Sequence, residues 1–479
     1  MSDDGRFYEL GDREQPKLYG PSLREAIADD AEVLALDAAV AQLDFGPLEA
    51  RYQRVGHPAF PPRAMFKVLV YGYASGLRSS RQLDRACRRE DAFRFLAHGL
   101  TPDFRTLCRF RRQHAAALGE LFRQTVRLCP QAGLVSLGQV AVDGTKLRAN
   151  RSGRTLAAEQ VWKQALSEAE EQDADIPPDS EQLQAEAARF MKQPAGIKPG
   201  YHAQLAVDSA QQVIVAQELD GQASDQGRLP ELVEQVERTC GAPPQVVTAD
   251  GGYYAQAALE QLEAGPSQVY VPAPTSGSTS FEWLAQPGAY RCPQGHWLLP
   301  GAQRGGRQIY RTHRCGRCPQ AQRCGVKGHV KELHVPLTET ALGRLAQRMS
   351  TPAGQALYAA RARIVEPVFG QFKHSRGFRR LLLRGRTGAS AEWSLMCIAH
   401  NLGKWVQALR AGLVRLRPQG ELARSAPQAL LAALAVRYAR LVLKTLRPLR
   451  YCYSAKGRCP LFTKPQSCPQ SMMIRAGAN

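Results

Sequence analysis

Hydrophobic residues recur at three- and four-residue spacing from about residue 20 to residue 131. This spacing places apolar side chains on one side of an α-helix, so the pattern predicts a series of short helices. Residues that favour helix starts, among them Ser22 and Asp103, precede several of these segments. The predicted helices cover residues 23–36, 63–76, 81–87 and 104–114.

The pattern changes after residue 137 to short apolar runs separated by polar turns, which is typical of strands alternating with helices. The predicted order is strand, strand, strand, helix, strand, helix, strand, and it indicates a mixed α/β sheet. The strands are expected at 139–143, 201–207, 211–219, 245–248 and 269–272, and the helices at 229–240 and 257–263. Two segments interrupt this order: a predicted helical insertion at 151–195 and a glycine-rich, cysteine-bearing segment at 274–350. A long helical region is expected to resume near Leu342.

The charge distribution predicts that the protein binds a polyanionic partner. Lys and Arg total 63 against 43 Asp and Glu, which gives a net charge of +20. Residues 361–386 carry eight basic side chains and one acid, and residues 401–450 carry ten and one. Such clustering is typical of nucleic-acid-binding surfaces, because cations placed near phosphates release condensed counterions.

The helical region contributes to the basic surface, and both a DNA-binding domain and a helical bundle with a solvated basic face fit its pattern. We expect these of its arginines to be exposed: Arg78, Arg81, Arg85, Arg88, Arg89, Arg105, Arg109, Arg111 and Arg112.

No apolar run follows Met1, and the apolar stretch at 429–443 is short and contains Arg437 and Arg440. We therefore expect no secretory leader, no membrane span and a cytoplasmic protein. In the cytoplasm, the twelve cysteines are expected to be reduced thiols or metal ligands rather than disulfides.

Two aspartates follow apolar runs and precede glycines. Asp143 lies in Ala-Val-Asp-Gly-Thr-Lys, and Asp250 lies in Val-Val-Thr-Ala-Asp-Gly-Gly-Tyr. Carboxylates at the ends of adjacent strands can converge on hard cations such as Mg²⁺. Each Asp-Gly pair alone also fits a structural turn. We expect Gly144 to let the backbone turn sharply beside Asp143.

Glu366 and Lys373 lie seven positions apart, so on a helix they share one face, two turns apart. A carboxylate for a metal ion and an ammonium for a phosphate would then point to one place. Pro367 disfavours helical geometry at the preceding residue, which predicts a kink or a helix start at Glu366. An exposed ion pair or a helix cap is the alternative reading of this pair.

These segments resemble bacterial insertion-sequence transposases of the DDE class, whose catalytic core is ribonuclease-H-like. Glu366, six intervening residues and Lys373 are similar to the Glu-and-Lys signature of that family, with Tyr358 and Arg361 before it and Arg363 as the alternative arginine. Residues 57–111, 200–208, 376–380 and 392–402 are also similar to segments of these proteins, so that the resemblance covers roughly residues 20–405.

The resemblance implies an α/β, ribonuclease-H-like mixed sheet flanked by helices, with an N-terminal helical domain and a cysteine-bearing insertion. It implies that Asp143, Asp250 and Glu366 form a catalytic triad that binds two Mg²⁺ or Mn²⁺ ions. Water would attack the phosphate at a transposon end and free a 3′-hydroxyl, which would then attack target DNA. The residues that would bind DNA phosphates are Lys373, Arg363, Tyr358, Arg361 and Arg376.

The predicted domains are an N-terminal helical, DNA-binding domain at 20–131, a catalytic core at 137–405, and a basic C-terminal helix with a disordered tail at 406–479. The implied partners are terminal inverted repeats and target DNA, bound by a homodimer associated with the nucleoid. A catalytically inactive, domesticated DNA-binding protein and another ribonuclease-H-like nuclease, such as a resolvase, are the alternatives. The presence of all three carboxylates argues against the first, and the basic helical region together with the Glu-to-Lys spacing argues against the second.

A cysteine cluster lies inside the second insertion. Cys315 and Cys318 form a Cys-x-x-Cys pair, and Cys292 and Cys324 could complete a tetrahedral zinc site. His296 and His313 are competing ligands. Structural zinc and reduced, partly buried thiols both fit this spacing.

Overall fold

The structure is a computed structural model that describes residues 6–15, 20–28, 30–53, 57–150, 188–193, 196–222, 224–273, 281–284, 286–324, 326, 328–416 and 422–423. The basic region beyond residue 423, with its apolar stretch at 429–443, lies outside these residues. So does the predicted helical insertion at 151–195, except for residues 188–193, which contain a strand, β2 (Arg189–Gln193). No helix in the described ranges is long and apolar enough to cross a membrane.

Short helices form the N-terminal region, as the apolar spacing predicts. Ser22 begins the first helix through a capping box with Glu25, and Asp103 accepts a hydrogen bond from the Thr106 amide at 2.7 Å. The predicted helix at 23–36 is two helices, because the chain leaves helical geometry and Asp30 caps a new start. The helices are α1 (Leu23–Ala26), α2 (Ala31–Ala41), α3 (Gly46–Glu49), α4 (Pro62–Ala74), α5 (Ser80–Arg89), α6 (Asp91–Leu96), α7 (Phe104–Gln113) and α8 (Ala115–Gln131).

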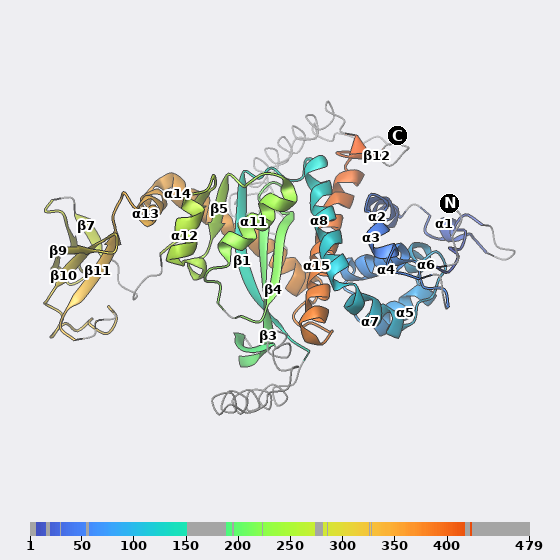
Figure 1. Ribbon diagram of the computed structural model, residues 1–479, viewed down its shortest axis with the longest axis horizontal. Coiled ribbons are helices and arrows are strands. Elements are labelled where there is room, and N and C mark those ends of the chain that lie inside the picture. Colours follow the sequence, from blue (N-terminus) through green and yellow to red (C-terminus); the bar gives the residue numbers. More distant parts are fainter. Residues whose placement is uncertain are drawn as a thin grey trace, which may run out of the picture. The chain divides into compact units, whose positions relative to one another are not determined.

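A mixed sheet follows, in the order β2-β3-β1-β5-β6, with β4 paired to β3 (Figure 1). β1 is antiparallel to β3 and parallel to β5. This mixed α/β sheet with a helical region before it confirms the predicted fold class. The strand bounds are β1 (Gln139–Arg148), β3 (Gly196–Asp208), β4 (Ile214–Asp220), β5 (Val246–Ala249) and β6 (Gln268–Tyr270).

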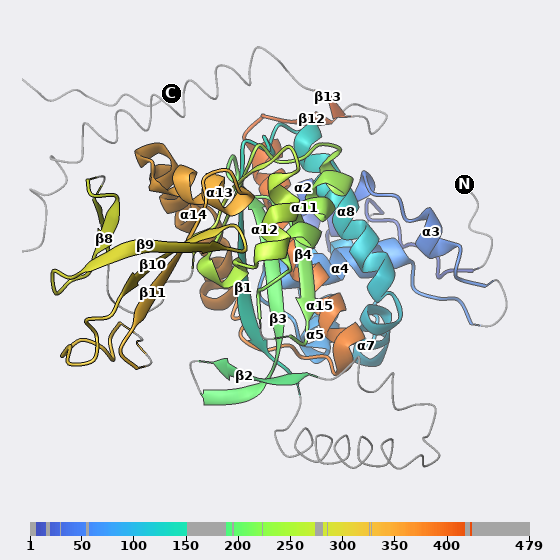
Figure 2. The same ribbon diagram turned by 60° about the vertical axis from the view of Figure 1, so that its left-hand side comes forward.

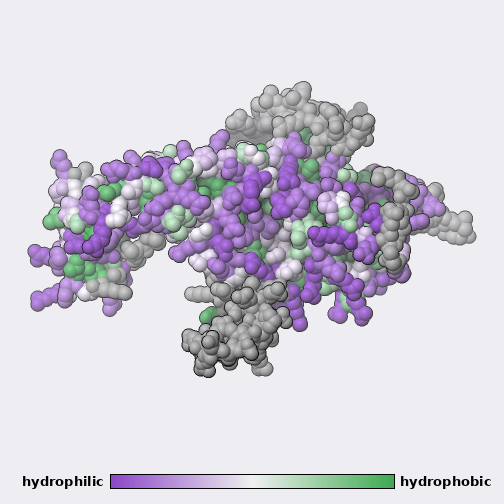
Figure 3. Space-filling view, in the orientation of Figure 1, coloured by the Kyte–Doolittle hydropathy of each residue, from purple (hydrophilic) through white to green (hydrophobic). Residues whose placement is uncertain are grey.

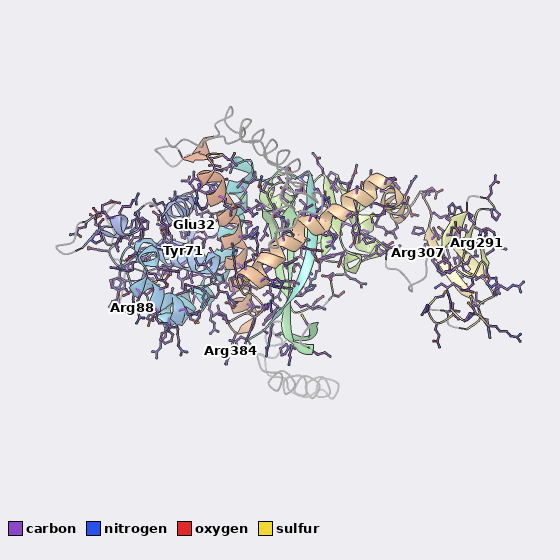
Figure 4. All side chains as sticks on the ribbon, turned by 180° about the vertical axis from the view of Figure 1, so that it is seen from behind. Glu32, Tyr71, Arg88, Arg291, Arg307 and Arg384 are labelled. Carbon is purple, nitrogen blue, oxygen red and sulfur yellow. The ribbon has the colours of Figure 1, made fainter. Side chains whose placement is uncertain are left out.

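Helices cover both faces of this sheet. Figure 1 shows α11 (Leu229–Cys240) and α12 (Gln256–Glu263) in front of it, and Figure 4 shows α14 (Pro352–Gly370) crossing its rear face. α13 (Ala341–Ser350) precedes α14, and a π-helical turn, Gln371–Ser375, follows it. The last long helix, α15 (Gly385–Arg410), packs against α2, α4, α8 and β4. The N-terminal helices and the sheet therefore share one hydrophobic core.

The predicted alternative of a helix start at Glu366 is wrong, because α14 begins at Pro352 and continues through Pro367 to Gly370. A proline inside a helix leaves the carbonyl four residues before it without its backbone donor. Here that carbonyl belongs to Arg363, and the side-chain amide of Gln212 donates to it at 3.1 Å. The turn between β3 and β4 thus satisfies the acceptor that Pro367 exposes.

The cysteine-bearing segment forms a second, antiparallel sheet in the order β11-β10-β9-β8-β7, best seen in Figure 2. The sequence predicted a glycine-rich, cysteine-bearing insertion here and assigned no strands to it, since its strands carry no clear apolar alternation. Gly305 and Gly306 adopt positive φ in the turn between β9 and β10. The strands are β7 (Glu282–Leu284), β8 (Ala289–Arg291), β9 (Trp297–Arg304), β10 (Arg307–Thr312) and β11 (Lys331–Pro336). Two paired strands of two residues each, β12 (Arg415–Leu416) and β13 (Leu422–Ala423), end the described part of the chain.

A buried polar cluster joins the helical region to α15. Tyr73 donates a hydrogen bond to Glu392 at 3.1 Å, and Arg111 donates to the Tyr73 hydroxyl at 2.9 Å. The guanidinium of Arg111 lies 3.8 Å from the Glu392 carboxylate, and both side chains are 1% exposed. The predicted exposure of Arg111 is therefore wrong, because its charge is needed opposite Glu392. Arg78 is also partly buried, where it donates to the carbonyl of Gly377.

We predict that Glu392→Ala lowers the free energy of unfolding by about 3–5 kcal/mol, because it leaves the Arg111 charge buried without its partner. Tyr73→Phe removes the hydroxyl that bonds to Glu392 and Arg111. It should lower the free energy of unfolding by about 1 kcal/mol. Urea denaturation followed by circular dichroism measures both. Glu234→Ala, at a side chain that is 66% exposed, is the control. Equal losses for Glu392→Ala and this control would contradict the assignment.

Candidate active site

Asp143 lies in the middle of β1, partly buried. One carboxylate oxygen, Oδ2, is 3.1 Å from Nη1 of Arg361 on α14, and the Gly144 amide donates to Oδ1 at 2.8 Å. Burial raises the pKa of Asp143, and the Arg361 guanidinium opposes that shift. The carboxylate is thus held between the sheet and the helix behind it.

Asp250 directly follows β5. Because β1 and β5 are parallel and Val142 pairs with Ala249, the two aspartates come next to each other at the same level of the sheet. The Gly252 amide donates to Asp250 Oδ1 at 2.9 Å and begins a short 3₁₀ turn, Gly251–Tyr253. The negative charge of Asp250 adds to the rise in the pKa of Asp143, so the two carboxylates repel each other.

The predicted sharp turn at Gly144 is wrong. β1 continues through this residue to Arg148, and Gly144 pairs with Gln204 on β3. A Cβ atom at Gly144 would lie 2.4 Å from Nε2 of His202 and 2.8 Å from Oδ1 of Asp225. The glycine is required because two polar side chains approach the backbone closely, not because the chain turns.

Asp225 and His202 are site residues that sequence reasoning missed. His202 is a buried residue of β3, and Asp225 lies in the loop between β4 and α11. Asp225 Oδ1 is 3.2 Å from His202 Nε2. Burial raises the pKa of Asp225, His202 opposes the shift, and the charges of Asp250 and Asp143 add to it. A histidine within the apolar run at 201–207 was the available signal.

Lys373 reaches the same region from the π-helical turn after α14. Its ammonium donates a hydrogen bond to the Thr145 hydroxyl, two residues after Asp143. Burial lowers the pKa of Lys373, whereas the charge of Asp143 opposes that shift. The guanidinium of Arg361 lies over the Tyr358 ring, 5.9 Å from its centroid. Two cationic groups therefore border the aspartates.

Three predicted residues lie elsewhere on the same segment. Glu366 and Arg363 are exposed on α14, and no hydrogen bond or ion pair joins Glu366 to either aspartate among the described residues. Arg376 is partly buried. Burial lowers its pKa, and the charge of Glu32 on α2 opposes that shift. In the described part of the chain, no three His, Cys, Asp or Glu side chains form a ready-made metal-binding group. The structure thus brings together Asp143, Asp250, Asp225, Arg361 and Lys373.

The four cysteines of the second sheet face one small cavity, which His296 also lines. All four are free thiols. Burial raises the pKa of Cys315, and the charges of Cys318, Cys292 and Cys324 add to this rise. His313 lines a neighbouring cavity with Cys318 instead.

A basic groove of about 740 Å³ runs between α7 and the start of α15. Arg105, Arg109 and Arg112 line it from α7, and Arg384, labelled in Figure 4, lines it from the other side. Arg88 on α5, also labelled there, is exposed as predicted. The face of the molecule in Figure 3 is mainly hydrophilic, in line with the charged composition.

Two family models match the chain. The "Transposase domain (DUF772)" family matches residues 21–113, and the "Transposase DDE domain" family matches residues 291–406. The second range contains Glu366 and Lys373, whereas Asp143 and Asp250 lie outside both ranges. No curated protein matches the chain. The two matched domains, one in the helical region and one from the second sheet through most of α15, place this protein among the insertion-sequence transposases of the DDE class.

Proposed function

We propose that this transposase cuts DNA at the ends of its element and transfers the freed strands to target DNA, with Asp143, Asp250 and Glu366 binding two divalent cations. The observation that carries the proposal is the pairing of β1 with β5, which sets two partly buried aspartates side by side. A fold that holds two like charges together in this way is suited to a cation between them.

The donor set fits Mg²⁺ or Mn²⁺, because carboxylate oxygens are the ligands that such hard cations prefer. When bound, two such ions activate the attacking oxygen and stabilise the leaving oxygen of a phosphodiester. Glu366 is proposed from its match to the family signature. Its exposed carboxylate lies on the helix that carries Arg361 and leads into Lys373.

The cationic side chains would hold the DNA phosphates and offset negative charge that develops at the reacting phosphorus. Lys373 is best placed for this role, since its ammonium lies beside Thr145 on the strand that carries Asp143. Arg361 pairs with Asp143 in this structure. Arg363, Tyr358 and Arg376 are proposed as further DNA contacts on the basis of the resemblance alone.

The helical region at residues 20–131 is proposed to bind the terminal inverted repeats. Its support is the basic groove, where three exposed arginines of α7 face one side and Arg384 faces the other. Arginines that border an open groove can follow a phosphate backbone. A homodimer that bridges two ends would present two such grooves.

A structural zinc ion is proposed for the second sheet. The four thiols line one cavity, and the other three add to the raised pKa of Cys315. A dication that binds them as thiolates would offset this repulsion. The Cys-x-x-Cys pair supplies two ligands from one turn, and Cys292 and Cys324 supply the others. Binding of the zinc ion would bring the four sulfur atoms closer together.

We predict that Asp143→Ala, Asp250→Ala and Glu366→Ala each reduce strand nicking by at least about 100-fold, because each removes part of the transition-state stabilisation. Purified protein is incubated with DNA carrying the element's ends, with Mg²⁺ or with chelator, and nicking and gel mobility are measured. DNA binding should stay nearly unchanged in all three variants.

Glu234→Ala is the matched control and should nick normally, since this exposed acid lies on α11. Full activity of any one of the three variants would remove that residue from the triad. Binding without nicking by the unmutated protein, under every divalent metal, would favour the domesticated DNA-binding protein.

We predict that Arg109→Ala combined with Arg112→Ala weakens DNA binding and lowers the slope of log Kd against log salt by about 2, since each phosphate contact contributes about 0.9. Fluorescence anisotropy with labelled DNA at several salt concentrations measures both. The control replaces Arg123 and Arg127, which pair with Glu120 on α8. An equal effect in the control would show a diffuse charge effect and not a groove.

We predict that the purified protein carries one zinc ion per chain and that Cys318→Ser loses it. Elemental analysis measures the metal, and Co²⁺ substitution should give strong thiolate-to-metal absorption bands that the variant lacks. Cys108→Ser, on α7, should keep the full metal content. Absence of zinc and of the Co²⁺ bands from the unmutated protein would leave the four residues as reduced thiols.

A further inference from the structure

We propose that Asp225 is an additional ligand of the divalent cations at the Asp143–Asp250 centre, and that His202 is the positioning residue that holds it there. The inference rests on the proposed function, because it assumes that Asp143 and Asp250 bind these cations. Neither Asp225 nor His202 lies within the residue ranges that the two transposase families match.

The first argument is the space around two glycines. A Cβ atom at Gly252 would lie 3.0 Å from Asp250 Oδ1 and 3.1 Å from Asp225 Oδ2, so both carboxylates border the same small space. A Cβ atom at Gly144, next to Asp143, would meet the other oxygen of Asp225 at 2.8 Å. Gly144 and Gly252 therefore both leave room for the same carboxylate, that of Asp225.

The second argument is electrostatic. Three carboxylates gather beside Gly144 and Gly252, and each of Asp143 and Asp250 acts on Asp225 by repulsion. Arg361 pairs with Asp143, and His202 contacts Asp225. Burying a third acid beside two others is unfavourable unless cations offset the charge. Among the described residues, these carboxylates do not form a ready-made ligand group, so a bound cation would have to draw them closer together.

The third argument is the rigidity of His202. It is a residue of β3 that pairs with Lys146 on β1 and with Asp220 on β4, so strands fix its backbone on both sides. Its side chain is 3% exposed, and its Nε2 lies 3.2 Å from Asp225 Oδ1, close enough for an ion pair but without hydrogen-bond geometry. Its Nδ1 is buried and has no hydrogen-bond partner among the described residues. Asp225 belongs to a loop, and the strand-held His202 contributes to its position together with Tyr253, which also acts on its carboxylate.

The test is cation binding to the full-length protein without DNA, measured with Mn²⁺ by isothermal titration calorimetry. Asp225→Asn, a variant of nearly the same shape, should weaken Mn²⁺ binding by about tenfold or more. His202→Ala should weaken it similarly, whereas His202→Gln, whose amide nitrogen can reach Asp225, should restore much of it. Glu231→Gln on α11 removes the same charge at a side chain that is 57% exposed and should bind normally.

Thermal melting of the same proteins separates a ligand role from a merely structural one. In chelator, Asp225→Asn should melt at or above the temperature of the unmutated protein, because a repelling charge is gone. Addition of Mn²⁺ should then raise its melting temperature less than that of the unmutated protein. A lower melting temperature in chelator with an unchanged Mn²⁺ response would overturn the proposal.

Asp143→Asn separates failure of this inference from failure of the proposed function. If Asp143→Asn loses Mn²⁺ binding while Asp225→Asn binds as the unmutated protein does, Asp225 is not a ligand and the catalytic centre stands. If neither variant changes Mn²⁺ binding, the cation site lies elsewhere and the proposed function loses its metal centre as well. Loss in both variants, with normal binding by Glu231→Gln, supports the inference.

Discussion

Repulsion between carboxylates is the constraint around which the mixed sheet of this protein is arranged. β1 and β5 pair in parallel, and the pairing sets Asp143 and Asp250 beside each other at one level of the sheet. The surrounding structure offsets the repulsion with cationic groups from other elements, Arg361 from α14 and Lys373 from the turn after it. The strands supply the anions, and the helical segment behind them supplies the cations.

That arrangement requires α14 to stay in place against the sheet. Pro367 removes one of the helix's own hydrogen bonds, and Gln212, from the β3–β4 turn, replaces it at 3.1 Å. Further along the chain, α15 packs on β4 and on the N-terminal helices, where Glu392 faces Arg111 and Tyr73. Arg111, which the sequence pattern places on the surface of the helical region, thus helps to hold α15 against the mixed sheet.

Helices and strands were predictable from the sequence where the residue pattern of the segment itself determines them. The expected helix at 229–240 coincides with α11, and the strand expected at 245–248 differs from β5 by one residue at each end. Asp143 and Asp250 were recognised for the same reason, since an apolar run followed by Asp-Gly is visible in one short segment. Only Asp250 lies at a strand end, because β1 continues past Asp143 to Arg148.

Features that depend on distant partners were not predictable. The charge of Arg111 is buried because Glu392 meets it from the other end of the chain. Asp225 joins the site because β3 and the loop before α11 meet beside Gly144, which no local pattern reveals. The second sheet went unrecognised because its strands are largely exposed and lack apolar alternation.

Gly144 also bears on how this protein could be engineered. A glycine inside a strand ordinarily lowers stability, and its replacement by alanine is a standard route to a more robust enzyme. At this position the added methyl group would meet His202 and Asp225 at 2.4 Å and 2.8 Å, so the strand or the two side chains would have to move. Gly144 is therefore a glycine inside β1 that cannot be replaced by alanine to stabilise the protein.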